Sequence, residues 1–212
     1  MALMRYSPTD IKSNPEFELL DVLHYDGVLN FARKYIRKNT RSMIFFYIFL
    51  ICTLVLLVGA MIYGMVNHNR AFLGILKQYF YGLLISFSII IPVHEIVHGM
   101  VYVLLGAKKI LFGAEIKQFA FYAVADEFVT GRAGFYMLAI SPFIVISLLN
   151  LAGFIFVRGV ASYTYLSMLF FHTTMCIGDF ALMSYYDINK EKEIYTFDDV
   201  KSRISYFYCR KK

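Results

Sequence analysis

Four long apolar runs constrain this chain more than any other feature of its sequence. They cover residues 43–65, 78–105, 134–157 and 162–186, and each reaches the roughly 20 apolar residues that cross the hydrocarbon core of a bilayer as a helix. Only 17% of the residues are charged, whereas a soluble domain usually carries about a quarter. The sequence therefore predicts an all-α polytopic membrane protein with four transmembrane helices.

The distribution of Lys and Arg predicts the orientation of these helices. Seven basic residues precede the first run, four follow the second and seven follow the fourth, against two and one in the other connections. The positive-inside rule then places both chain ends in the cytoplasm. Because the basic residues flank apolar runs, the net charge of +6 indicates a lipid bilayer as the partner and not nucleic acid.

On this interpretation the chain has three parts. Residues 1–42 form a cytoplasmic N-terminal segment whose amphipathic stretch, over residues 29–38, is expected to lie on the membrane surface. Residues 43–186 form the membrane core, and residues 187–212 form a cytoplasmic tail. The segment between the second and third runs contains two apolar stretches that are too short to cross a bilayer. They predict a strand-like insert, either an interfacial hairpin or a strand that pairs with a substrate.

The second run contains the sequence His94-Glu95-Ile96-Val97-His98. Histidines four residues apart share one face of a helix, so both imidazoles can reach a single tetrahedral Zn²⁺. Glu95 lies beside them, where it can take a proton from a zinc-bound water. An ionisable side chain near the bilayer centre costs roughly 2.5–3.5 kcal/mol on insertion scales. That cost favours a zinc site over a polar cluster that merely joins helices by hydrogen bonds.

A catalytic zinc site needs a third protein ligand, and Asp179 is the one acidic residue of the four runs besides Glu95. The second and fourth helices run in the same direction in the predicted topology. His98 and Asp179 each lie about ten residues, or roughly 15 Å, from the cytoplasmic end. We therefore expect Asp179 to complete a site for one Zn²⁺ per chain; the alternative is a hydrogen bond between helices. For His172, a satisfied polar group between helices is favoured over contact with a substrate carbonyl or an oxyanion.

These features together resemble the Putative zincin peptidase family: HEIVHG in the second run, the strand-like insert, Ser141-Pro142 in the third run and Gly178-Asp179 in the fourth. Its members are short bacterial four-span membrane proteins that are distantly similar to the site-2 proteases. The resemblance covers residues 78–187 and implies metal ligands at His94, His98 and Asp179, with Glu95 as the catalytic acid/base. Site-2 proteases usually present their acid in an Asn-Pro…Asp-Gly context, whereas Phe180 follows the acid here.

The sequence thus predicts a zinc metalloprotease of the bacterial cytoplasmic (inner) membrane. It would hydrolyse peptide bonds in or near membrane segments, so its partner would be a membrane-protein or membrane-peptide substrate. One alternative is a catalytically silent zinc- or substrate-binding membrane protein that acts through a partner. Another is a metal transporter, which is disfavoured because the predicted spans hold a single ionisable cluster where a transport pathway needs several.

Overall fold

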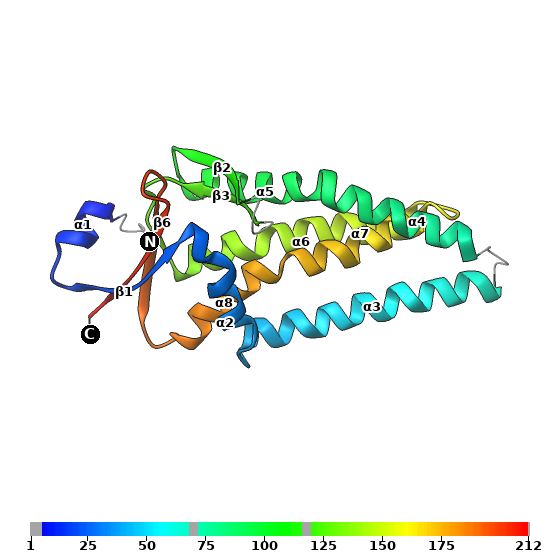
Figure 1. Ribbon diagram of the computed structural model, residues 1–212, viewed down its shortest axis with the longest axis horizontal. Helices are drawn as coiled ribbons and strands as arrows, with labels where there is room; N and C mark the ends of the chain where they lie inside the picture. Colours follow the sequence, from blue (N-terminus) through cyan, green and yellow to red (C-terminus); the bar gives the residue numbers. More distant parts are fainter. Residues whose placement is uncertain (1–5, 68–71, 116–119, 212) are drawn as a thin grey trace.

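The computed structural model describes residues 6–67, 72–115 and 120–211 and shows a body of long helices with small sheets at one end (Figure 1). The body consists of α3 (Arg41–Asn67), α4 (Phe72–Ile85), a π-helical turn (Ser86–Ile90), α5 (Ile91–Leu105), α6 (Arg132–Phe156), α7 (Ser162–Met175) and α8 (Ile177–Ile188). Within the described residues, three helices are long and apolar enough to cross a membrane: α3, the continuous helix over 72–105, and α6. The pair α7–α8 meets the same criteria only when it is taken as one span bent by 41°.

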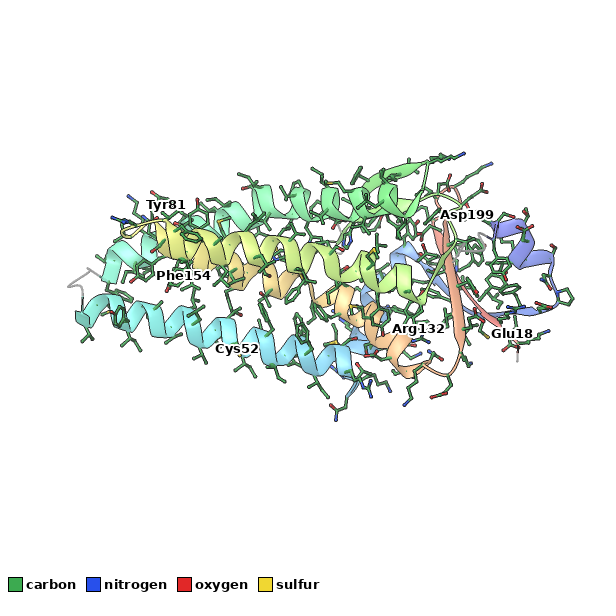
Figure 2. All side chains as sticks on the ribbon, turned by 180° about the vertical axis from the view of Figure 1, so that it is seen from behind. Glu18, Cys52, Tyr81, Arg132, Phe154 and Asp199 are labelled. Atoms are coloured by element: carbon green, nitrogen blue, oxygen red, sulfur yellow. The ribbon has the colours of Figure 1, made fainter. Side chains whose placement is uncertain are left out.

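The outer surface of the helical body is apolar. On α3, for example, Ile51 and Val55 are exposed, as expected for a helix that faces lipid along most of its circumference. Figure 2 shows that Phe154 lies toward one end of this body, whereas Arg132 and Asp199 lie toward the end that carries the sheets. The end with the sheets therefore carries charged residues such as Arg132 and Asp199 next to the long apolar body.

Both ends of the chain join one antiparallel sheet, with strand order β1-β6-β5-β4. Its strands are β1 (Phe17–His24), β4 (Thr130–Gly131), β5 (Glu193–Asp199) and β6 (Ile204–Arg210). A short helix, α1 (Pro8–Ser13), packs on this sheet through Ile11, which contacts Phe17 and Phe197. The all-α prediction is therefore wrong at this end of the molecule, because residues on both sides of the helical body pair with each other as strands.

The predicted insert after the second run is a hairpin of β2 (Ile110–Glu115) and β3 (Ala120–Ala125). Residues 116–119, between the two strands, lie outside the described residues. The hairpin packs closely on α5, since a Cβ at Gly99 would come within 2.8 Å of the Phe112 ring. The prediction of short strands between the second and third helices is confirmed.

An amphipathic helix connects the sheet to the first long helix. A 3₁₀ turn (Tyr25–Gly27) leads into α2 (Val28–Ile36), whose apolar side packs on α8. The Tyr35 ring packs edge-on against Tyr185 at 5.3 Å between centroids, and the Ser184 hydroxyl donates a hydrogen bond to the Tyr35 carbonyl at 3.1 Å. The amphipathic stretch is thus helical, and its apolar side covers the helix that carries Asp179.

Gly82 allows α4 and α7 to approach closely. A Cβ at this position would lie 2.5 Å from the Ser167 Cβ and 2.6 Å from the Thr164 carbonyl oxygen. We expect Gly82→Ala to lower the free energy of unfolding by about 1–3 kcal/mol, because the added methyl group must push backbone apart. Thermal unfolding in detergent measures this effect. Gly74→Ala in the same helix is the control, since no atom lies within 4 Å of its Cβ position; equal melting of the two variants would contradict the close packing.

Candidate metal centre

His94 and His98 lie one turn apart on the buried face of α5. Pro92, near the start of this helix, has no N–H to donate, and the helix widens into the π-helical turn Ser86–Ile90 immediately before it. Such widened turns are frequent at functional sites. The Nε2 atoms of the two histidines are 3.0 Å apart, so both rings point at one place.

The hydrogen bonds made by the Nδ1 atoms determine whether each Nε2 atom carries a proton or a free lone pair. The Nδ1 atom of His98 lies 3.1 Å from the carbonyl oxygen of Leu138 on α6. A carbonyl can only accept, so this Nδ1 carries a proton and the neutral ring presents a lone pair at Nε2. The Nδ1 atom of His94 lies 3.2 Å from Nε2 of His172. When that Nδ1 donates, the Nε2 atom of His94 presents a lone pair as well.

Asp179 reaches the same place from α8. Its carboxylate oxygens lie 3.1 Å from Nε2 of His94 and 3.4 Å from Nε2 of His98. The residue sits in the first turn of its helix, where the partial positive charge of the helix N-terminus stabilises a carboxylate.

The bend between α7 and α8 creates that helix start. The hydroxyls of Thr173 and Thr174 donate to the carbonyls of Leu169 and Phe171 at 2.7 and 2.6 Å, and such bonds often bend helices. Residues 162–186 were expected to form one continuous helix, whereas the structure breaks this helix at Cys176, three residues before Asp179.

The donor atoms of these three side chains lie close to the spacing of ligands around a tetrahedral zinc ion. With bonds of about 2.0–2.1 Å, ligand atoms of such an ion lie about 3.3–3.4 Å apart. Here the two Nε2 atoms are 3.0 Å apart, Oδ2 of Asp179 lies 3.1 Å from Nε2 of His94, and Oδ1 of Asp179 lies 3.4 Å from Nε2 of His98. Two lone pairs and a carboxylate at this spacing repel one another unless a proton or a metal cation lies between them. The structure thus brings His94, His98 and Asp179 together in a donor set that fits zinc.

Glu95 lies beside this donor set. A carboxylate oxygen of Glu95 and one ring nitrogen each of His94 and His98 all lie within 4.8 Å of one another. Its carboxylate accepts a hydrogen bond from the backbone N–H of Ala123 in β3. The hairpin therefore holds the carboxylate next to the ligands, and all four predicted site residues share one location.

A cavity of about 510 Å³ contains the site. Its wall includes Glu95 and Asp179, apolar side chains of α2, residues 121–124 of β3, and Asp198 of the four-stranded sheet. The cavity therefore reaches from the donor set to the end of the molecule that carries the sheet.

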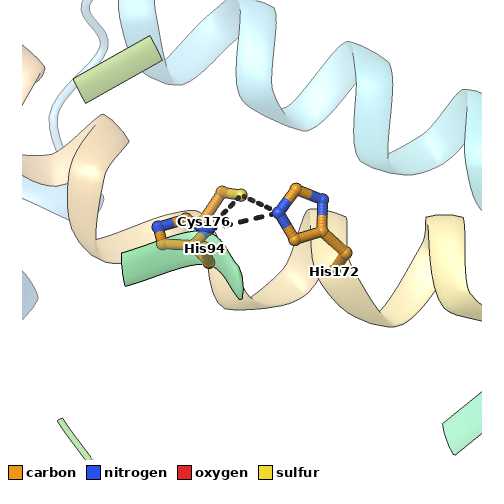
Figure 3. Close-up of side chains that lie close together, drawn as sticks. All are labelled: His94, His172 and Cys176. Atoms are coloured by element: carbon orange, nitrogen blue, oxygen red, sulfur yellow. Dashed lines mark hydrogen bonds between the residues drawn. The ribbon is translucent and has the colours of Figure 1, made fainter. Parts of the chain in front are cut away.

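His172 and Cys176 also lie at the site, although the sequence did not predict that either residue contacts the metal ligands. His172 Nε2 lies 3.5 Å from the Cys176 Sγ atom, and both atoms face His94 (Figure 3). The expectation of a satisfied histidine is wrong for one ring nitrogen, because Nδ1 of His172 is buried with no hydrogen-bond partner among the described residues. The available signal was the spacing of four residues between His172 and Cys176, which places both on one helix face.

Asp198 is a partly buried acid on the sheet side of the cavity. Burial, aided by the nearby carboxylate of Asp126, raises the pKa of Asp198 to about 6. The folded protein then holds this proton up to about pH 6, whereas the unfolded chain releases it near the ordinary value of 3.8. Because the folded state binds more protons in that interval, the contribution of Asp198 to stability falls as the pH rises from 4 to 6.

Asp198→Asn should therefore become progressively more stable than the wild type as the pH rises from 4 to 7. Thermal unfolding in detergent across that range measures the difference. Asp199→Asn is the matched control. Hydrogen bonds from Ser202 lower the pKa of Asp199, so the stability of this variant relative to wild type should change with pH in the opposite direction. A difference between Asp198→Asn and wild type that does not change with pH would contradict the raised pKa.

Comparison with known proteins gives one finding. A family model described as Putative zincin peptidase matches residues 87–194, a segment that contains all four predicted site residues. No curated protein and no solved structure matches the chain significantly.

Proposed function

The chain belongs to the Putative zincin peptidase family, and from this we propose that it is a zinc metalloprotease that cleaves membrane segments of other proteins. The observation that carries the proposal is the convergence of two imidazole nitrogens and a carboxylate within 3.4 Å of one another, with Glu95 beside them. Such a set binds a divalent cation and leaves one tetrahedral position open, as catalytic zinc sites do.

Each of the four residues has a role in this proposal. His94, His98 and Asp179 hold one catalytic Zn²⁺, which supplies Lewis-acid activation of water and of the scissile carbonyl. Glu95 takes a proton from the attacking water and returns it to the leaving amine. The N–H of Ala123 keeps the Glu95 carboxylate at the correct side of the ligands, so the base need not be reoriented during the reaction.

Four membrane crossings are part of the proposal. The two ends of the chain pair in one sheet, β1 with β6, at the same end of the helical body (Figure 1). An even number of crossings accounts for this, which supports α7–α8 as a fourth, bent span. The excess of Lys and Arg at the end with the sheets supports a cytoplasmic location for that end, in the inner membrane of a bacterium.

The β2–β3 hairpin favours a substrate that binds in an extended conformation. Among the described residues, β3 pairs with β2 along one of its edges. The N–H of Ala123, which donates a hydrogen bond to Glu95, is on the other edge of β3. A segment added to that edge by backbone hydrogen bonds would run past Glu95 and the metal ligands. A transmembrane substrate must therefore unwind locally, which also exposes its carbonyls to attack.

Cleavage by the reconstituted protein tests the proposed function. We expect the protein in lipid nanodiscs to cut some members of a panel of transmembrane peptides, near the end of the segment that lies at the sheet side. Mass spectrometry of the products locates the cut. A chelator should stop the reaction and added zinc should restore it. A protein that binds zinc at this site yet cuts no member of the panel would instead favour the silent zinc-binding alternative.

A further inference from the structure

The two ring nitrogens of His94 point to two different groups of side chains. Its Nε2 atom points to His98 and Asp179, whereas its Nδ1 atom lies 3.2 Å from Nε2 of His172 and 4.0 Å from Sγ of Cys176 (Figure 3). We propose that His94, His172 and Cys176 form a second metal site, for a thiophilic d¹⁰ cation, either copper(I) or Zn²⁺. The sharing of His94 between two metals rests on the proposed function, but the second site itself does not.

The geometry of this cluster fits a metal with two nitrogen ligands and one sulfur ligand. Bonds of about 2.0–2.1 Å to nitrogen and about 2.3 Å to sulfur put such ligand atoms about 3.3–3.6 Å apart in a tetrahedral site. The separations are 3.2 Å between the two nitrogens and 3.5 Å from His172 Nε2 to Cys176 Sγ, both within about 0.1 Å of this range, and a longer 4.0 Å from His94 Nδ1 to Cys176 Sγ. His172 and Cys176 are completely buried, so these ligands are already ordered without any contact with solvent.

Hydrogen bonds satisfy this cluster poorly once Nε2 of His94 binds a metal at the first site. If Nε2 of His172 accepts, its single lone pair faces two donors, the His94 Nδ1–H and the Cys176 thiol. If it donates instead, His94 accepts at Nδ1 and its Nε2 donates to the Asp179 carboxylate 3.1 Å away, an arrangement that a metal bound at Nε2 of His94 excludes. A cation among the three atoms removes this conflict, because His172 Nε2, Cys176 Sγ and His94 Nδ1 then all act as electron-pair donors.

Charge balance favours copper(I) over Zn²⁺. A monovalent ion with one thiolate is neutral, which suits a buried site among apolar helices, and thiolate ligands select soft cations. When both nitrogens of His94 are bound, the ring loses its proton and carries one negative charge. Zn²⁺ with that ring and the Asp179 carboxylate is then neutral as well, and the displaced protons leave for the solvent.

Metal titration of the full-length protein in detergent tests the second site. The protein is first stripped by chelation and then titrated with Co²⁺, whose bond to a thiolate gives a charge-transfer band in the near ultraviolet. We expect two equivalents per wild-type chain, one of them with that band. Anaerobic competition with copper(I) and with Zn²⁺ then shows which ion displaces cobalt from the thiolate site at the lower concentration.

Four variants separate the two sites. Cys176→Ser should lose the band and one equivalent, and His172→Gln should do the same if the serine variant does not fold. Cys52→Ser is the matched control, since this cysteine is exposed on α3, and it should keep both metals. Asp179→Asn should lose the other equivalent and keep the band.

The possible failures are distinguishable. One equivalent without a thiolate band, lost in Asp179→Asn, would overturn the second site and leave the proposed function intact; His172 would then only orient His94. A single equivalent with the band, lost in Cys176→Ser and kept in Asp179→Asn, would overturn the proposed catalytic site and leave the His94–His172–Cys176 cluster as the metal centre.

Discussion

Glu95→Gln is expected to lower the rate of peptide cleavage by about 100- to 10,000-fold, the range that a general base contributes, while the zinc content of the protein stays unchanged. The amide cannot take a proton from water, but its size preserves the packing against β3 and the two histidine ligands are untouched. Cleavage of a transmembrane peptide in nanodiscs gives the rate, and atomic absorption of the same preparation gives the zinc content.

Glu191→Gln is the control for this change, because Glu191 is an exposed carboxylate far from the site, paired loosely with Lys190 at 4.0 Å. It should cleave at the wild-type rate. Activity of Glu95→Gln within a few fold of wild type would show that another group activates the water, and loss of zinc in this variant would show that Glu95 is a ligand.

Asp179→Asn is expected to weaken zinc binding by more than about 100-fold and to abolish cleavage with it. Loss of a residue that merely orients a ligand typically costs 10- to 100-fold in metal affinity, so loss of a charged ligand should cost more. The neutral amide also removes the negative charge that balances the cation among apolar helices. Competition with a chromogenic chelator measures the affinity.

Asp187→Asn, on the same helix, is the matched control. The Asp187 carboxylate accepts hydrogen bonds from the Tyr136 hydroxyl at 2.5 Å and from the Ser42 backbone N–H at 2.8 Å, so it serves packing and not the donor set. This variant should bind zinc as the wild type does, even if it melts at a lower temperature. Equal zinc affinities of Asp179→Asn and wild type would remove Asp179 from the site.

The arrangement of the site was largely predictable because it depends on helix geometry. His94 and His98 share a face through a spacing of four residues, which is a local property of any helix. The meeting with Asp179 was predictable because helix rise converts sequence distance into depth, and the basic residues fix which helices run in the same direction.

The four-stranded sheet could not be predicted in the same way. Residues 193–199 and 204–210 are rich in aromatic residues, which favour strands, so a hairpin there had a local signal. The pairing of β1 with β6 had none, because Phe17 and Arg210 are brought together by the path of the whole chain. The all-α prediction failed because it rested on the long apolar runs, and these runs describe only the helices.

The contact of His94 with His172 and Cys176 also depends on tertiary structure. A helix over 162–186 without a break predicts that His172 and Asp179 share nearly one face, about 10 Å apart. The bend at Cys176 and the first turn of α8 instead bring both residues to the same histidine ring, within 3.2 Å. Thr173 and Thr174, whose hydroxyls donate to carbonyls of their own helix, lie at the bend, and sequence alone does not reveal whether such threonines bend a helix.

An anomalous-scattering map at the zinc absorption edge, from an experimental structure of the zinc-loaded protein, tests the central claim most directly. The account predicts a peak about 2.0–2.2 Å from Nε2 of His94, Nε2 of His98 and a carboxylate oxygen of Asp179. A well-ordered site with all three side chains in place and no peak between them would contradict it.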